Sequence, residues 1–305
     1  MGRKDDLTGS LLIAASTVFF SLAGSVARRL FVSGPASPVI VVECRLVSSF
    51  LILLCALAVA APQRIRFRRE HLLYFMAYGI IGMGCVQLTF YTALGEGTVS
   101  TAIFLQYMAP VLSAAYFALA ERRLPESRLL RSISLATAGL VLLLVGGGGM
   151  STTPLGFIAG LMSAGFLSFY TIYGSVGLKI YPPQTMLLWA CGFASLFLMA
   201  LKPPWTILQA GLSARDWLSV GFIAILGTLI PMLIFLEGLK RVSALRAILI
   251  MTLEPVLASG FAWLLLSESL NAAQTAGGVL IIIAVVSIQA QQAKSPAVSV
   301  GKPAP

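Results

Sequence analysis

Charged residues are scarce in this chain. Aspartate, glutamate, lysine and arginine make up 10% of its 305 residues, against about 25% in an average soluble domain. Hydrophobic residues make up 58%. A soluble core cannot bury that much apolar surface, so lipid must surround most of the chain.

The chain lacks the residues and motifs that several classes of enzyme need. Histidine occurs once, as His71, and aspartate occurs at positions 5, 6 and 216, outside the expected membrane core. These counts exclude a histidine metal site, an intramembrane aspartyl protease and a serine hydrolase with a base beside its nucleophile. There is no G-x-x-x-x-G-K-[ST] or H-E-x-x-H motif, which argues against ATP hydrolysis and zinc proteolysis. We therefore predict that the protein is not an enzyme and binds no cofactor.

The four cysteines, Cys44, Cys55, Cys85 and Cys191, lie in apolar runs without metal-ligand spacing, so we expect them to pack and to bind no metal. The net charge of +10 would favour nucleic acid in a soluble protein. In an apolar chain it indicates basic loops that face anionic lipid. We predict lipid and a small molecule as partners, no nucleic acid, and no particular oligomeric state.

Ten apolar runs approach the roughly 20 residues that a membrane span requires. Glycine, proline and charged residues separate them. They predict an all-α membrane protein with ten transmembrane helices at about 7–27, 37–60, 71–94, 99–119, 129–149, 154–175, 184–202, 215–237, 244–266 and 273–292. With the N-terminus inside, most loop lysines and arginines fall on the same side, which predicts that both termini are cytoplasmic.

The second half of the chain repeats the first. Pro110 and Pro255 lie 145 residues apart, and each is followed by Val-Leu. Residues matched at this offset, or at 147 further upstream, include Gly82/Gly227, Leu88/Leu233, Ser16/Ser163, Phe19/Phe166, Ser21/Ser168 and Cys44/Cys191. Five spans per unit is an odd number, so the units must enter the membrane from opposite sides as inverted five-helix repeats. The predicted divisions are 1–149, 150–292 and a disordered tail at 293–305.

The ten spans, the duplicated unit and the Pro-Val-Leu elements resemble the drug/metabolite transporter superfamily in its EamA branch. Glu254-Pro255, the run 267–270 (Ser-Glu-Ser-Leu), Gln274, Gly277 and Gly278 look like the ending of that branch. In the first half, a longer basic loop follows Glu121, which departs from the branch's compact pattern. The resemblance implies a bacterial inner-membrane carrier that works by alternating access. Within the branch the chain looks most like exporters of amino acids, including aromatic ones.

Four ionisable residues lie within spans: Glu43, Arg45, Glu237 and Glu254. An arginine at mid-membrane costs about 3 kcal/mol, so it usually faces a cavity or a partner. Arg45 could attract a substrate carboxylate, form a salt bridge or reach the interface. Glu254 could bind an ammonium group or a proton, or help to pack a helix that Pro255 breaks. Glu43 and Glu237 are expected nearer the water interface.

Polar and aromatic residues at helical spacing suggest a cavity for a zwitterion with an apolar side chain, or for an aromatic cation. The candidate substrate-binding residues are Ser16, Phe20, Tyr78, Gln87, Tyr91, Gln106, Tyr107, Ser163, Phe166, Tyr170 and Glu254. Packing and interfacial placement are the alternatives for these side chains. Pro110, Pro231 and Pro255 are the candidate hinges, since proline removes a helix hydrogen bond.

These features together predict a secondary transporter that exports amino acids or related small metabolites. A multidrug exporter of lipophilic cations is the main alternative, and it would depend on a membrane glutamate. A channel or a scaffold for other membrane proteins is a weaker alternative. A sugar-phosphate carrier is weaker still, because a dianion usually needs several basic residues and Arg45 is the one deep cation.

Overall fold

The computed structural model describes residues 3–33, 38–122, 124–203, 205, 211, 213–266 and 271–292. The predicted tail at 293–305 lies outside them. Within the described part, secondary structure is helical apart from one isolated β-bridge between Gly97 and Thr152. The helices of the first half are α1 (Arg3–Ser33), α2 (Pro38–Ala60), η1 (Pro62–Arg64), η2 (Arg69–His71), α3 (Leu72–Ala77), η3 (Tyr78–Gly84), α4 (Cys85–Gly95), α5 (Val99–Gln106), α6 (Ala109–Glu121) and α7 (Ser127–Gly146).

The second half has the same plan. Its helices are α8 (Pro154–Gly177), α9 (Pro183–Leu201), α11 (Ala214–Ala224), η4 (Ile225–Leu229), α12 (Ile230–Leu239), α13 (Ala244–Met251), α14 (Leu253–Leu266) and α15 (Ala272–Gln292). Over the described residues, nine helical segments are long and apolar enough to cross a membrane, and a tenth, Ala272–Ser287, is apolar but shorter. The all-helical membrane architecture is therefore as predicted.

Spans four and nine are each broken where the sequence places proline. A proline cannot donate to the carbonyl four residues earlier, which is that of Gln106 for Pro110 and that of Met251 for Pro255. The helices α5 and α13 end at these two residues, and α6 and α14 begin beyond them. The breaks are thus local consequences of the sequence, repeated once in each half.

Spans three and eight each contain a π-helical segment, η3 and η4. The last five residues of η3, Ile80–Gly84, correspond to η4 at the offset of 145. Pro231 is the second residue of α12, two residues after η4 ends. These wide turns were not predicted, although the matched glycines Gly82 and Gly227 lie inside them. Such segments often mark functional positions within helices.

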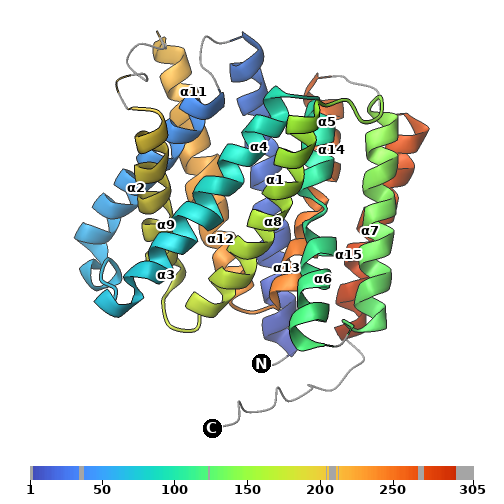
Figure 1. The fold of residues 1–305 in the computed structure, drawn as a ribbon, viewed down its shortest axis with the longest axis horizontal. Coiled ribbons are helices and arrows are strands. Elements are labelled where there is room, and N and C mark those ends of the chain that lie inside the picture. The colour runs from blue at the N-terminus through green and yellow to red at the C-terminus, as the bar shows by residue number, and fades with distance from the viewer. Residues whose placement is uncertain are drawn as a thin grey trace.

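The two halves pack into each other rather than side by side. The first helix of the first half, α1, packs on α12 and α14, and the first helix of the second half, α8, packs on α4, α5 and α6. Likewise α2 packs on α11 and η4, whereas α9 packs on α3 and η3. In Figure 1, α1 begins at the lower edge beside the label N, whereas α8 begins at the upper edge and runs down. This is the arrangement expected of an inverted repeat.

The connection between the halves is a glycine turn that backbone hydrogen bonds attach to a neighbouring loop. Gly148 and Gly149 have φ values of +100° and +82°, a backbone conformation that favours glycine. Beyond them, the Thr98 amide donates to the Ser151 carbonyl at 3.1 Å, and the Thr153 amide donates to the Glu96 carbonyl at 3.1 Å. The start of the second half is therefore held against the loop between α4 and α5.

The helices α7 and α15 pack backbone to backbone at two glycines. A Cβ atom on Gly139 would lie 2.6 Å from the Gly277 carbonyl oxygen, and one on Gly277 would lie 2.9 Å from the Leu143 amide nitrogen. Small residues permit this approach, which helix association in membranes exploits.

We expect Gly139→Ala to destabilise the protein by about 1–3 kcal/mol, because the new methyl group overpacks against backbone that cannot rotate away. The measurement is the thermal melting temperature of the detergent-solubilised protein. Gly165→Ala is the matched control: it lies within α8, and nothing is within 4 Å of its added Cβ, so its melting temperature should not fall. Equal melting temperatures for all three proteins would contradict the close packing.

Candidate functional site

A hydrogen bond joins the two broken spans. The Tyr107 hydroxyl, at the break between α5 and α6, donates to Glu254 Oε2 at 2.5 Å. Glu254 is the second residue of α14, directly after the break in span nine. Tyr107 is 3% exposed, whereas Glu254 keeps part of its surface accessible. Discontinuous helices commonly place charged and polar groups at the substrate site of a transporter, which makes this pair the centre of the candidate site.

A symmetric pair of serine hydrogen bonds supports the two breaks. Ser21 Oγ lies 3.0 Å from the Glu254 carbonyl oxygen, and Ser168 Oγ lies 3.1 Å from the Ala109 carbonyl oxygen. Each hydroxyl shares its one proton between this carbonyl and a nearer one in its own helix, that of Thr17 at 2.7 Å or that of Ala164 at 2.8 Å. Ser21 and Ser168 match at the offset of 147, and Ala109 and Glu254 match at 145. Each half therefore ties its first helix to the break in the other half. The repeat pair Ser21/Ser168 signalled this role in the sequence, although neither serine was among the candidate residues.

Arg45 brings a positive charge to the same interior. It lies on α2, its side chain is half-buried, and its Cζ lies 6.0 Å from the centroid of the Tyr91 ring on α4. Arg45 Nε is buried with no hydrogen-bond acceptor among the described residues. The guanidinium acts electrostatically on Glu254 and on the Cys191 thiol.

The charged candidates Arg45 and Glu254 occupy positions at which the two halves of the sequence differ. The position equivalent to Arg45 is Gly192 at the offset of 147, and the position equivalent to Glu254 is Ala109 at 145. Matched positions such as Ser21 and Ser168 make the same hydrogen bonds in both halves. A symmetric scaffold with asymmetric charges is what a site needs in order to recognise an asymmetric molecule.

Two candidate serines are satisfied within their own helices. Ser16 and Ser163 are 0% exposed and donate to the carbonyls of Ile13 (2.7 Å) and Gly160 (2.8 Å). Matching sequence positions again make matching backbone contacts. Their hydroxyl protons are used within the helices in this conformation, so a role in binding stays a prediction that needs rearrangement.

The aromatic candidates Tyr78 and Tyr170 form part of a buried stack. Their rings lie 4.7 Å apart at an angle of 9°, and Tyr170 continues to Phe235 at 6.5 Å. The stack joins η3, α8 and α12, and its three members are at most 3% exposed. In this conformation it is packed core between the halves. The remaining candidates, Phe20, Gln87, Gln106 and Phe166, are half-buried, and their participation also stays a prediction.

The other two predicted charged residues, Glu237 and Glu43, form no hydrogen bond with the Tyr107–Glu254 pair in the described part of the chain. Glu237 Oε1 pairs with Arg241 Nη2 at 2.7 Å, and both side chains are about one-third exposed. Glu43 is 0% exposed, and its expected position nearer the water interface stays a prediction. The prolines Pro110, Pro231 and Pro255 are buried at helix starts beside the breaks or the π-helical segment, and their action as hinges stays a prediction. Among the described residues, no three histidine, cysteine, aspartate or glutamate side chains lie together in a way that could hold a metal ion.

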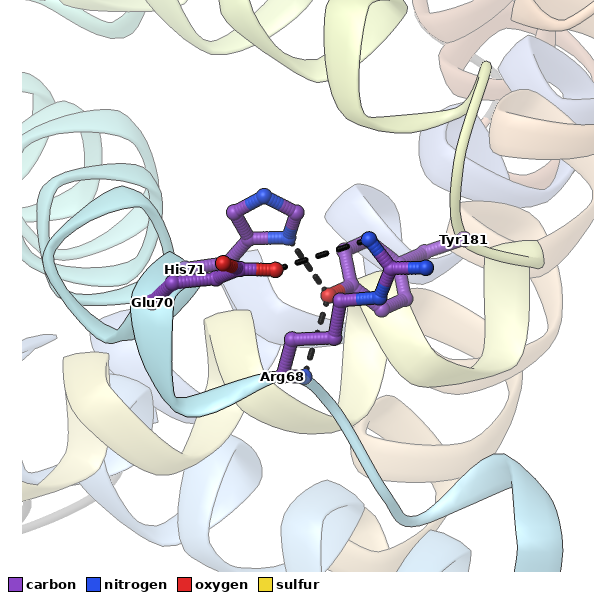
Figure 2. A network of polar contacts seen from close by, with 4 residues as sticks. All are labelled: Arg68, Glu70, His71 and Tyr181. Carbon is purple, nitrogen blue, oxygen red and sulfur yellow. Dashed lines mark hydrogen bonds and ion pairs between the residues drawn. The ribbon is translucent and has the colours of Figure 1, made fainter.

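A polar cluster that was not predicted joins the halves at one end of the bundle (Figure 2). The Tyr181 hydroxyl accepts from the Arg68 amide at 3.1 Å and shares a hydrogen with His71 Nδ1 at 2.6 Å. Trp189 Nε1 also donates to the Ile65 carbonyl at 2.8 Å. The loop between α2 and α3 is thereby attached to the start of α9. We call Arg68, His71, Tyr181 and Trp189 the loop latch.

Comparison with known proteins shows the family to which this sequence belongs. A family model described as the EamA-like transporter family matches residues 7–145 and 154–289. The threonine/homoserine exporter RhtA of Salmonella typhimurium is 28% identical over 283 residues, covering 91% of this chain and 88% of that protein. The uncharacterised inner membrane transporter YicL of the same species is 26% identical over 222 residues, covering 72% of this chain and 74% of YicL.

A solved crystal structure shares the fold. It has a TM-score of 0.75 at 17% sequence identity, covering 97% of this chain and 100% of the solved one. The helical repeats, the broken spans and the family match agree with one another. The chain belongs to the EamA-like transporter family, within the drug/metabolite transporter superfamily.

Proposed function

We propose that this membrane transporter exports small zwitterionic amino acids across a bacterial inner membrane, with both termini in the cytoplasm. The single observation that carries the substrate class is that the helical interior holds an arginine, Arg45 on α2, and a glutamate, Glu254 on α14. Arg45 offers a guanidinium whose Nε has no acceptor among the described residues, and Glu254 offers a carboxylate that Tyr107 orients. An α-amino acid carries the two complementary charges on adjacent groups.

The roles follow from charge and geometry. The substrate carboxylate would accept charge-assisted hydrogen bonds from Arg45, in the forked geometry that guanidinium groups favour. The substrate ammonium would face Glu254. Tyr91, whose ring lies beside Arg45, would contact the apolar part of the substrate. RhtA is described as a threonine/homoserine exporter, which agrees in class with this proposal without naming the side chain that this protein accepts.

The same geometry disfavours a lipophilic cation as the substrate. A cation exporter needs a carboxylate with little competing positive charge. Here the charge of Arg45 already acts on Glu254, and the Tyr107 hydroxyl occupies one of its oxygens. A lone cation would also leave the charge of Arg45 uncompensated in the interior, which is costly in a membrane.

Alternating access would use the symmetry of the fold. The broken spans and the π-helical segments occur once in each half at equivalent positions, so one half can adopt the bend of the other. The substrate then meets the same charges from either side while the halves rock around it. The loop latch would close one end in the conformation seen here.

Counterflow in proteoliposomes tests the substrate class. We expect purified protein, preloaded with an unlabelled α-amino acid, to accumulate the labelled amino acid transiently. External zwitterionic amino acids should compete, whereas a quaternary ammonium compound and the corresponding amine without a carboxylate should not. Competition by the quaternary cation with no effect of amino acids would establish the multidrug alternative instead.

A further inference from the structure

Glu43 is a fully buried carboxyl group with no hydrogen-bond partner among the described residues. It lies in the second turn of α2, it is 0% exposed, and neither Oε1 nor Oε2 has a donor there. Glu254, by contrast, accepts a hydrogen bond from Tyr107. An ionised carboxylate is not stable in an interior without donors, and such a group takes up a proton instead. We therefore expect Glu43 to be neutral in this conformation.

The internal repeat shows that this position does not require a carboxyl group for packing. The equivalent position in α9 is Ala190, at the offset of 147, and it is also 0% exposed. Ala190 packs on η3, where a Cβ on Gly79 would lie 3.0 Å from its carbonyl oxygen. The same site in the same fold is thus filled by a methyl group. Since the carboxyl group of Glu43 makes no hydrogen bond with the described residues, we expect it to act in another state.

Glu43 belongs to the end of the bundle at which α2 begins, opposite to the start of α1 (Figure 1). Nearby, Ile40 and Cys44 pack on Val220 of α11, and Ser49 Oγ donates to the Ala224 carbonyl at 3.0 Å. These contacts join α2 to the π-containing span of the other half. Opening this end would separate them and admit water to Glu43.

Charges on the surrounding elements determine how an ionised Glu43 would be stabilised. Among the described side chains, the titratable groups on the elements packed against α2 are Arg64, Cys85, Tyr91, Cys191, Lys202 and Asp216. Cys44, Arg45 and Cys55 lie on α2 itself. The ammonium group of Lys202, which comes directly after the last residue of α9, acts electrostatically on Glu43. Asp216 caps the start of α11 by accepting from Ser213.

We propose that Glu43 is the proton-binding site of a gate formed by α2, α9 and α11. Its carboxyl group is protonated when the end of the bundle at which α2 begins is closed. When this end opens, the group is ionised and is stabilised by the charge of Lys202. The inference rests on the proposed transport function and adds its regulation by pH. Opening converts the buried carboxyl into a hydrated carboxylate and releases one proton to the water that enters. Closing takes the proton back.

The direction of the pH effect follows from this linkage. Because the closed state holds one more proton than the open state, raising the pH favours opening. With a single proton, the ratio of open to closed states changes by at most about tenfold per pH unit. Glu43→Gln is neutral at every pH, so it mimics the protonated form and should favour the closed end.

Hydrogen exchange of the purified protein tests the gate without any substrate. We expect wild-type backbone amides at the start of α2 and the end of α9 to take up more deuterium at pH 8 than at pH 6, after correction for the chemical rate. Glu43→Gln should lose this difference, and Glu43→Asp, which keeps the carboxyl group, should retain it. The same pH dependence in wild type and Glu43→Gln would overturn the proposal.

Counterflow at equal internal and external pH supplies the second measurement. Wild-type exchange should rise from pH 6 to pH 8, and exchange by Glu43→Gln should be slower and flat over this range. If no protein exchanges amino acids at any pH, the proposed substrate class fails, whereas hydrogen exchange still decides the role of Glu43. Amino-acid exchange with an identical pH profile in both proteins would reject the gate and leave the substrate class intact.

Discussion

Replacing Arg45 with glutamine should lower kcat/KM for amino-acid transport by about 10- to 150-fold. The variant loses charge-assisted hydrogen bonds to the substrate carboxylate, each worth about 1.5–3 kcal/mol. Arg45 Nε has no acceptor among the described residues, so the lost energy would be that of binding rather than of folding. Initial counterflow rates over a range of substrate concentrations measure the effect. Arg45→Lys keeps the positive charge but lacks the forked N–H donors of a guanidinium, so it should retain part of the activity.

A matched control separates the site from general effects of removing an arginine. Arg241→Gln removes a guanidinium that pairs with Glu237 at 2.7 Å on a partly exposed face. Such pairs contribute about 0–1 kcal/mol, so its kcat/KM should stay close to that of the wild type. Arg45→Gln with wild-type kcat/KM would remove Arg45 from the site and with it the main support for the substrate class.

Glu254→Gln should weaken the preference for an amino group. The wild type should favour an α-amino acid over the matching 2-hydroxy acid, because the ammonium group faces the carboxylate that Tyr107 orients. We expect that preference to fall by about tenfold or more in the variant, since a hydrogen bond to a charged group contributes about 1.5–3 kcal/mol. Competition by the two analogues in counterflow measures the ratio directly.

The control for Glu254 is Glu126→Gln, which removes a carboxylate whose side chain is 63% exposed beside Arg128. It should leave the preference unchanged. Tyr107→Phe should lower the preference less than Glu254→Gln does, since it removes the positioning hydroxyl and keeps the carboxylate. Unaltered discrimination between the two analogues in Glu254→Gln would mean that Glu254 does not face the substrate amine.

The sequence predicted the spans and the breaks well because both depend on neighbouring residues. Bilayer thickness requires long apolar runs. Pro110 and Pro255 have no N–H group to donate to the carbonyl four residues earlier, so a helix ends at that residue in each case. The asymmetric charges Arg45 and Glu254 were also visible, as positions at which the repeat fails. Their mismatch with Gly192 and Ala109 is a property of the sequence alone, and it could have ranked them above the matched serines.

Other features depended on contacts that a linear pattern does not encode. Ser16 and Ser163 looked like candidates by spacing, but each hydroxyl bonds to its own helix. The partner of Glu254 was not predictable, since Tyr107 lies 147 residues away in the chain. The loop latch depends on Tyr181 reaching a loop of the other half. For Glu254 and for the loop latch, the packing of distant helices selects the partner.

By itself, the sequence determined that this is a helical membrane protein made of two similar units, because apolar length, proline position and internal repetition act locally along the chain. Tertiary structure alone decided which polar groups are satisfied, which pair across the halves and which remain available. In an interior without water, the availability of a polar group depends on whether a donor or acceptor from another helix lies within about 3 Å. Arg45 and Glu43 differ from Ser16 and Ser163 in that respect, and helix packing sets that difference.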